Sequence, residues 1–282
     1  MSDAAVKETT YLEAIREAIV EEMRSDETVF ILGEDIGAYG GAFKVTDGLL
    51  DEFGPDRVID TPISEAAIVG AAIGAAHMGL KPIAEMQFID FIAPAFDMIV
   101  NFAAKSRYRT GIGAGIVIRG PCGAGARSGP FHSQSVESYF ANVAGLKMVA
   151  PARAYDAKGL LRASIRDPDP VLYFEHKFLY RRIKEALPVD EEVFVPLGKA
   201  RTHRSGDDLT IVTYGAMVYK AADAAEQISE QDGSEIEVVD LRTLRPLDTA
   251  AIVESVRRTG RLLVVHEAPR FGGFAGEITA QV

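Results

Sequence analysis

Short apolar segments alternate with segments of helical period along most of this chain. VFILGE at 29–34 and GIVIRG at 115–120 are typical of buried strands, whereas TYLEAIREAIVEEMR at 10–24 spaces its apolar residues for a helix. Strands that alternate with helices at this spacing form parallel sheets with helices on both faces. We therefore expect an α/β fold. The same pattern predicts further strands at 82–87, 146–151 and 170–176 and further helices near 64–79, 92–106 and 156–167.

The alternation stops at residues 185–200, EALPVDEEVFVPLGKA, which are acidic, hold two prolines and lack helical period. We interpret this segment as a linker with some extended structure between two doubly wound domains with mainly parallel sheets, at 1–184 and 201–282. Because the final FAGEITAQV begins like a helix but has no stop signal, we expect the second domain to be incomplete and the chain to be C-terminally truncated. The second domain is predicted from strands at 208–215, 235–241 and 261–267 and helices near 216–231 and 248–258.

The composition argues against several classes of partner. Hydrophobic residues make up 48% of the 282 residues and charged residues 25%, as in soluble globular proteins, and the net charge is −11. So acidic a chain is not expected to bind nucleic acid or an anionic membrane. Cys122 is the only cysteine, the start MSDAAVKETT lacks signal-peptide character, and no apolar run approaches the roughly 20 residues of a membrane span. These features predict a cytoplasmic protein without an intrachain disulfide.

One acidic residue stands before an almost uncharged segment. In DTPISEAAIVGAAIGAAHMG, residues 60–79, Ser64 is a candidate N-cap, and Glu65 is then the first residue of an Ala- and Gly-rich helix. An acid at this position favours the helix dipole and can simply face solvent. Alternatively, the small side chains let the helix pack closely and carry Glu65 into a buried site, where a carboxyl group of raised pKa can share a proton with a ligand nitrogen. The spacing alone leaves both interpretations open.

A glycine-rich loop follows the strand predicted at 115–120. This loop, GPCGAGARSGPFHSQS at 120–135, ends near His132, and a histidine at a sheet edge can act as a general acid or base near neutral pH. An idle histidine on a surface loop is the alternative. Cys122 and His132 could also form a nucleophile and base, which would make the chain a cysteine hydrolase, although no oxyanion motif accompanies them.

Two further segments carry side chains suited to ligands. In SIRDPDP, residues 164–170, Asp167 and Asp169 follow a predicted helix end, where acids oppose the helix dipole. A cation could compensate for them, but spacing alone favours a solvated Asp-Pro turn. Gln87 and Phe91 lie near another predicted helix start and could line a pocket for a flat heterocycle, unless the aromatic ring belongs to the core. The chain contains neither a G-x-x-x-x-G-K-[ST] phosphate loop nor zinc-type cysteine spacing.

Together these motifs closely resemble those of the β subunit of thiamine-diphosphate-dependent 2-oxo acid dehydrogenases. The resemblance runs from about residue 10 to the C-terminus, and it implies a pyrimidine-binding domain followed by a transketolase C-terminal-like domain. It also implies an enzyme that is active only with its α subunit. The matching stretches are LGEDIG, GPDRVIDTPISEAAIVGAAIGAA, PIAEMQFIDFI, AAKSRYRTG, FHSQS, YDAKGLLRASIRDPDPV and VVDLRTLRPLD.

The resemblance implies roles for single residues. Glu65 matches the glutamate that hydrogen-bonds the aminopyrimidine ring of thiamine diphosphate, and His132 matches an active-site histidine of the later acyl-transfer steps. Ile63, Gln87 and Phe91 match residues that line the same pyrimidine pocket. A structural potassium (K⁺) site, formed mostly by backbone carbonyls, is implied at Ile116, Ser164, Ile165, Asp167 and Asp169.

The family's Mg²⁺-diphosphate signature, GDG followed by an asparagine, is absent from this sequence. In the family it belongs to the α subunit, so the resemblance implies an α2β2 heterotetramer with two β subunits and an active site shared with α. The implied reaction decarboxylates a 2-oxo acid and transfers the acyl group to a lipoyl group of the acyltransferase core. FEHKFLYRRIKEALP at 174–188 is more similar to branched-chain members than to pyruvate or acetoin members. A non-catalytic scaffold of the same fold is the alternative from a different class.

Overall fold

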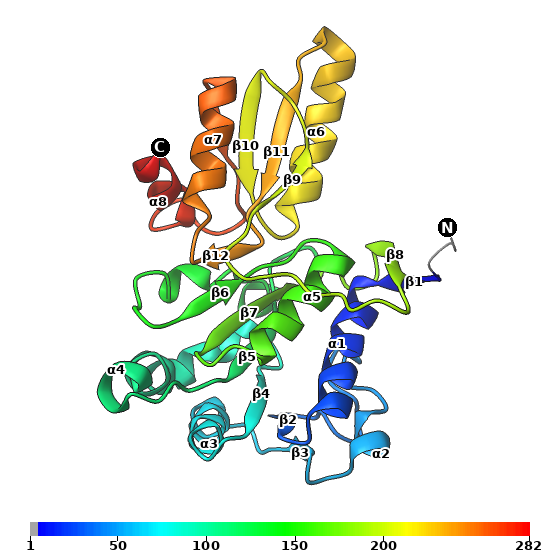
Figure 1. The fold of residues 1–282 in the computed structure, drawn as a ribbon, viewed down its shortest axis with the longest axis vertical. Helices are drawn as coiled ribbons and strands as arrows, with labels where there is room; N and C mark the ends of the chain where they lie inside the picture. Colours follow the sequence, from blue (N-terminus) through cyan, green and yellow to red (C-terminus); the bar gives the residue numbers. More distant parts are fainter. Residues whose placement is uncertain (1–4) are drawn as a thin grey trace.

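A computed structural model describes residues 5–282 of the chain. Two α/β units are stacked along the long axis of the molecule, each with its own sheet (Figure 1). The predicted α/β class with mainly parallel sheets is confirmed. Residues 1–4, with which the first predicted domain begins, lie outside the described residues.

The elements of the first unit are β1 (Val6–Thr10), α1 (Tyr11–Ser25), β2 (Val29–Gly33), α2 (Leu49–Phe53), β3 (Val58–Asp60), α3 (Glu65–His77), β4 (Lys81–Glu85), the 3-10 helix η1 (Ile89–Ala95), the π-helix η2 (Met98–Ala103), α4 (Ser106–Thr110), β5 (Val117–Cys122), the 3-10 turns η3 (Pro130–His132) and η4 (Glu137–Tyr139), β6 (Lys147–Val149), α5 (Ala154–Ile165), β7 (Val171–His176) and β8 (Lys184–Pro188). They are followed by β9 (Arg201–Arg204), β10 (Leu209–Thr213), α6 (Met217–Asp232), β11 (Ile236–Asp240), β12 (Thr243–Arg245), α7 (Thr249–Thr259), β13 (Leu262–Val264) and α8 (Phe274–Gln281).

Seven strands form the larger sheet, in the order β12-β6-β7-β5-β4-β2-β3. All neighbouring pairs are parallel except β12 with β6. The strands β2, β5 and β7 are buried along their whole length, as expected for parallel strands covered on both faces. The helices α1 and α5 pack together on one face, and α3 with η1 and η2 covers the other (Figure 1).

One strand of the second unit joins the larger sheet. The smaller sheet has the order β13-β10-β11-β9, in which only β9 is antiparallel. The next strand, β12, pairs instead with β6, so that Thr243 lies opposite Val149. This contact ties the second unit to the sheet that carries the predicted site. The sequence patterns did not predict β12, nor the short strands β1, β3 and β9.

The structure differs from the sequence prediction in the segment after β4. The single helix predicted over 92–106 is wrong, because η1, η2 and α4 follow one another there. Pro94 lies inside η1, and a residue without an amide hydrogen cannot support an unbroken α-helix at that position. The predicted linker also begins with ordered structure, since β8 pairs antiparallel with β1 and places Lys184 opposite Thr10.

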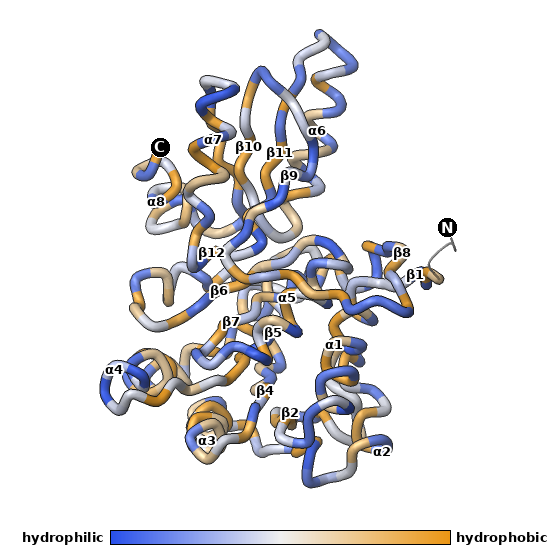
Figure 2. Tube along the Cα trace, viewed as in Figure 1, coloured by the Kyte–Doolittle hydropathy of each residue, from blue (hydrophilic) through white to orange (hydrophobic). Residues whose placement is uncertain are grey.

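Hydrophobic residues gather on the inner strands of the two sheets, and α3 is apolar along almost its whole length (Figure 2). That helix has only 13 residues. Over residues 5–282, no helix is long and apolar enough to cross a membrane.

Candidate active site at the strand ends

The predicted cofactor-binding and catalytic residues lie at one edge of the larger sheet, in loops or at helix starts. Because β2, β3, β4 and β5 are parallel, their carboxyl ends meet at this edge. Glu65 opens the helix after β3, Gln87 follows β4, and His132 lies in the loop after β5. The chain leaves β2 for β3 on one side and then returns to β4 on the other, which makes this a topological switch point. Ligands of doubly wound sheets bind in the crevice beyond such a point.

Glu65 is the first residue of α3, as the sequence predicts, and Ser64 occupies the N-cap position. Within the described chain, the Ser64 side chain makes no capping hydrogen bond. Glu65 is only partly buried, so this chain alone does not enclose its carboxyl group. The neighbouring Glu34 is buried, and its pKa is raised by that burial and by the nearby carboxylates of Glu65 and Asp35. Several acidic groups therefore meet at the switch point.

Two faces of α3 have different environments. Ile68 and Ala72 are buried against the first unit, whereas Ala67, Ala71 and Gly74 are exposed. Small side chains on the exposed face would let another backbone approach closely. An exposed apolar surface beside a crevice is typical of a contact with a partner.

Three aromatic rings meet at the same edge of the sheet. The ring centroid of His132 lies 4.6 Å from that of Phe88 and 5.4 Å from that of Phe91, both edge to face. Phe88 also contacts the ring of Phe43, at 5.4 Å. The structure thus brings His132 and Phe91 together. Sequence reasoning missed Phe88, because its local pattern does not separate an aromatic residue of a pocket from one of the core.

Two other predicted pocket residues, Gln87 and Ile63, lie in neighbouring loops. Gln87 donates a hydrogen bond from Nε2 to Oδ2 of Asp35 at 3.3 Å. Asp35 has a positive φ of 55°, a conformation that aspartate tolerates better than most residues. Ile63 is 82% exposed, which leaves its side chain available for a ligand or a partner.

Cys122 is unsuited to nucleophilic catalysis. It lies at the end of β5, where it is buried, and burial raises the pKa of its thiol well above the ordinary value. A buried, protonated thiol is unreactive, because the thiolate is the nucleophile. The structure therefore argues against the cysteine hydrolase considered from the sequence.

The predicted cation site lies at the opposite edge of the sheet, before the strands β5 and β7. Asp167 accepts two hydrogen bonds from Lys147 Nζ, at 2.7 and 2.6 Å. Asp169 Oδ1 accepts one from Arg107 Nε at 2.6 Å. The two basic side chains offset the acidic charges at the end of α5, so the carboxylates do not by themselves require a cation.

Backbone oxygens remain as candidate ligands at this edge. The carbonyl oxygen of Ile116 accepts from Val171 N at 2.9 Å, and that of Ser164 accepts from Asp167 N at 3.2 Å. Each carbonyl oxygen has a second lone pair that can face a cation. Among residues 5–282, no three His, Cys, Asp or Glu side chains gather as a metal site, so a cation here would rest on carbonyl oxygens.

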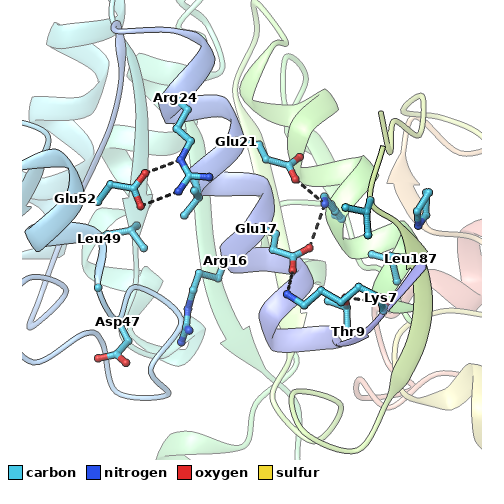
Figure 3. Close-up of a pocket in the computed structure, with 15 residues that line it drawn as sticks. Lys7, Thr9, Arg16, Glu17, Glu21, Arg24, Asp47, Leu49, Glu52 and Leu187 are labelled. Carbon is cyan, nitrogen blue, oxygen red and sulfur yellow. Dashed lines mark hydrogen bonds and ion pairs between the residues drawn. The ribbon is translucent and has the colours of Figure 1, made fainter. Parts of the chain in front are cut away.

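A separate pocket of about 450 Å³ lies between α1, α2 and the β1–β8 pair (Figure 3). Most of its charged side chains are paired with one another, including Lys7 with Glu17 at 2.8 Å and Arg24 with Glu52 at 2.6 Å. None of the predicted site residues lines this pocket. We therefore keep the candidate active site at the strand ends.

Comparison with known proteins identifies both units. The family described as "Transketolase, pyrimidine binding domain" matches residues 7–182, and "Transketolase, C-terminal domain" matches residues 198–282. A solved chain described as "Split gene transketolase, inactive beta4 tetramer" is similar with a TM-score of 0.77, covering 96% of this chain and 83% of that chain. At 24% identity this similarity shows the fold alone. The two units are thus of the transketolase type.

Curated relatives of similar sequence narrow the class of protein to which this chain belongs. The "2-oxoisovalerate dehydrogenase subunit beta" of Bacillus subtilis is 52% identical over 96% of this chain and 83% of its own length. The "Pyruvate dehydrogenase E1 component subunit beta-1, mitochondrial" of Arabidopsis thaliana is 48% identical over 99% of this chain and 78% of its own length. The chain belongs to the family of β subunits of thiamine-diphosphate-dependent 2-oxo acid dehydrogenases, and the resemblance found in the sequence is confirmed.

Proposed function

We propose that this chain is the β subunit of a decarboxylating 2-oxo acid dehydrogenase that transfers an acyl group to a lipoyl group. The observation that carries the proposal is the position of Glu65 at the switch point of the sheet. At the same edge, His132 meets the rings of Phe88 and Phe91. A carboxyl group, a histidine and aromatic surface at one edge of the sheet suit both proton positioning and the binding of a flat ring.

The residues at this edge fit the aminopyrimidine half of thiamine diphosphate. Ile63 and Phe91 offer apolar surface, and Gln87 offers an amide beside it. Glu65 stands at the partly open start of α3, where its carboxyl group can hold a proton at a ring nitrogen. When bound, thiamine diphosphate supplies the nucleophilic carbon and the electron sink for loss of CO₂. His132 then moves a proton during acyl transfer.

The partner that completes this site is an α subunit. The chain carries no Mg²⁺-diphosphate signature, so we propose that α holds the diphosphate and its Mg²⁺. The exposed face of α3 and the exposed Ile63 support this, because exposed apolar surface beside the proposed site is typical of an interface. We propose an α2β2 heterotetramer with a second β subunit, docked on a lipoyl acyltransferase core.

Branched-chain 2-oxo acids are the substrates that we favour. The segment FEHKFLYRRIKEALP at 174–188 supports this choice. The 52% identity to the 2-oxoisovalerate dehydrogenase subunit exceeds the 48% and 46% found for pyruvate dehydrogenase subunits. Since these values lie close together, pyruvate and acetoin are the substrates to compare in the assay of the assembled enzyme.

The role of Glu65 is tested by Glu65→Gln in the enzyme assembled with its α subunit. The amide keeps the size of the side chain but cannot hold the proton, so decarboxylation should fall by about 100-fold or more. Glu27→Gln, at an exposed acid outside the proposed site, is the control and should retain activity. Normal turnover of Glu65→Gln would exclude the proposed role.

The alternatives have their own tests. Full activity of the α subunit without this chain would favour a non-catalytic scaffold. Loss of an ester-hydrolysing activity in Cys122→Ala would favour the hydrolase, which the buried thiol argues against. The cytoplasmic location stays a prediction, and cell fractionation tests it.

We also propose a potassium ion at the edge of the sheet before β5 and β7. Its ligands are mainly backbone carbonyls of Ile116, Ser164, Ile165, Asp167 and Asp169. The support is the packing of the two loops: a Cβ atom on Gly115 would lie 3.0 Å from the carbonyl oxygen of Asp167. Several carbonyl oxygens in one small region suit K⁺, which proteins bind through such rings.

A further inference from the structure

The loop that carries His132 is closed at its base by backbone contacts. Gly123 N donates to the carbonyl oxygen of Gln134 at 2.9 Å, so residues 123 and 134 form a neck. Gln134 N in turn donates to Asp90 Oδ1 at 2.8 Å. The residues between, from 125 to 131, are exposed. The position of His132 therefore depends on what holds the neck in place.

The other side of the neck is held by a residue of the second unit. Ala124 N donates to Glu267 Oε1 at 2.7 Å, across 143 positions of sequence. Glu267 follows β13, and its side chain contacts the end of β7 in the larger sheet. Its second oxygen, Oε2, lies 2.5 Å from His176 Nε2, at the end of β7. Burial alone would raise the pKa of Glu267, but the hydrogen bond and charge of His176 hold it below the ordinary value.

A buried lysine, Lys177, lies beside the strand end from which the neck begins. Lys177 follows β7, and its backbone N donates to the carbonyl oxygen of Cys122 at 3.2 Å. Within residues 5–282, both Lys177 Nζ and Asp90 Oδ2 are buried without a hydrogen-bond partner. Burial lowers the pKa of Lys177, while nearby Cys122 and, to a smaller extent, Asp90 and Glu267 oppose that shift. Lys177 Nζ also lies 5.8 Å from the ring of Phe88, which contacts His132.

We propose that Glu267 is a positioning residue: it fastens the loop of His132 to the second unit and so holds His132 against Phe88 and Phe91. Asp90 fastens the same neck from the first unit, through its hydrogen bond with Gln134 N. The catalytic consequence rests on the proposed function. The structural consequence, a fastened loop, does not.

Limited digestion by trypsin tests the fastening directly. Arg127 is exposed within the loop, so cleavage after it reports how often the loop opens. In the full chain, Glu267→Ala should be cleaved at Arg127 about tenfold faster or more, because a charge-assisted hydrogen bond to the neck is lost. Glu267→Gln should stay near wild type, since its amide oxygen can still accept from Ala124 N. Glu230→Ala, at an exposed acid of α6, is the matched control.

A general loss of folding would give a different pattern from a loosened loop. In that case, Glu267→Ala would also be cleaved quickly at sites remote from the loop. Hydrogen exchange at the amide of Ala124 in Glu267→Gln then shows whether the carbonyl-type oxygen at position 267 holds the neck. Slow exchange at Ala124 in wild type and in Glu267→Gln supports the proposal. Equal cleavage at Arg127 in wild type and in a folded Glu267→Ala would overturn it.

Kinetics of the assembled enzyme test the consequence for catalysis. Decarboxylation is followed with an artificial electron acceptor, and acyl transfer with a free lipoyl domain. Because His132 acts in the later steps, Glu267→Ala should slow acyl transfer about tenfold more than it slows decarboxylation. Equal effects on both steps would contradict positioning of His132. If the wild type has no 2-oxo acid activity, the proposed function fails, and the digestion result still decides the fastening.

Discussion

Arg119 illustrates how single residues hold this sheet together. Its side chain is 1% exposed and lies at the centre of the larger sheet. It forms ion pairs with Glu85 on β4 and Glu175 on β7, the neighbouring strands on either side. Tyr180 donates a further hydrogen bond to Glu175 Oε2 at 2.7 Å. Removal of the guanidinium would leave two buried carboxylates without a counter-charge.

We predict that Arg119→Met lowers the free energy of unfolding by about 3–5 kcal/mol, the cost of breaking a buried pair from one side. The matched control is Arg24→Met, since Arg24 pairs with Glu52 at the surface. Exposed pairs of this kind contribute about 1 kcal/mol or less. Urea unfolding of both variants measures the difference. Equal losses would show that burial does not set the strength of the Arg119 network.

Asp240 is a buried acid with a strongly shifted pKa. Burial, together with the charge of Asp156, raises the pKa of Asp240 from 3.8 to about 7. Its Oδ1 accepts from Arg242 N at 3.0 Å. Among the described residues, its Oδ2 has no hydrogen-bond partner. The folded chain thus keeps a proton on Asp240 that the unfolded chain releases above pH 3.8.

This difference predicts a stability that depends on pH. The contribution of protonated Asp240 is fully present below pH 3.8 and is lost as pH rises to about 7, by up to about 1.4 kcal/mol per pH unit. Asp240→Asn has no such proton. Its free energy of unfolding, relative to that of wild type, should therefore grow from about pH 5 to about pH 7 and then level off. Urea unfolding across this range measures it. In Asp223→Asn, on the exposed side of α6, the free energy of unfolding should change with pH as it does in wild type. The same pH dependence in Asp240→Asn would exclude the shifted pKa of Asp240.

At the scale of elements, α5 provides the test of the cation. The end of this helix is already balanced by Lys147 and Arg107, so a bound K⁺ must act through the loop carbonyls. An ion present at about 100 times its dissociation constant adds about 2.7 kcal/mol to stability. Exchange of K⁺ for tetramethylammonium at equal ionic strength should therefore lower the melting temperature by several degrees. An unchanged melting temperature would mean that the ion pairs of Lys147 and Arg107 stabilise the end of α5 without a bound cation.

Elements with strong local patterns could be predicted from the sequence. The buried strands β2, β5 and β7 are continuous apolar runs, and α1 has a clear helical period, so their type follows from composition and spacing. The helix predicted over 92–106 failed because apolar periodicity does not show whether Pro94 permits an α-helix. β12 was missed because three residues carry no period and their partner, β6, is distant in sequence.

Some residues of the candidate site could likewise be predicted from the local sequence, and others could not. Glu65 and His132 could be chosen because they stand in distinctive segments, a helix start and a glycine-rich loop. Glu267 could not, since its hydrogen bond with Ala124 N forms only where the second unit meets the first. Phe88 was likewise missed, because its contact with His132 is a tertiary one. Contacts between segments distant in sequence leave no local signal.

The molecule as a whole presents α3 as a half-covered helix. Its exposed face carries Gly74, and within the described chain a Cβ atom there would meet nothing within 4 Å. Gly74→Ala should therefore stabilise the chain by about 0.5–1 kcal/mol, because glycine loses more conformational freedom than alanine in a helix. Gly74→Phe should also leave the isolated chain folded, since the larger side chain points to open space.

In the assembled enzyme we expect the reverse for Gly74→Phe. If α3 packs closely against the α subunit, a large side chain in its last turn separates the two backbones and weakens assembly by about 10-fold or more. Light scattering of co-expressed subunits measures the fraction in the heterotetramer. Glu230→Phe, on the exposed side of α6, is the control for added hydrophobicity and should assemble normally. Normal assembly of Gly74→Phe would show that the exposed face of α3 is not the interface, and the surface around Ile63 would then have to be covered by another element of the partner.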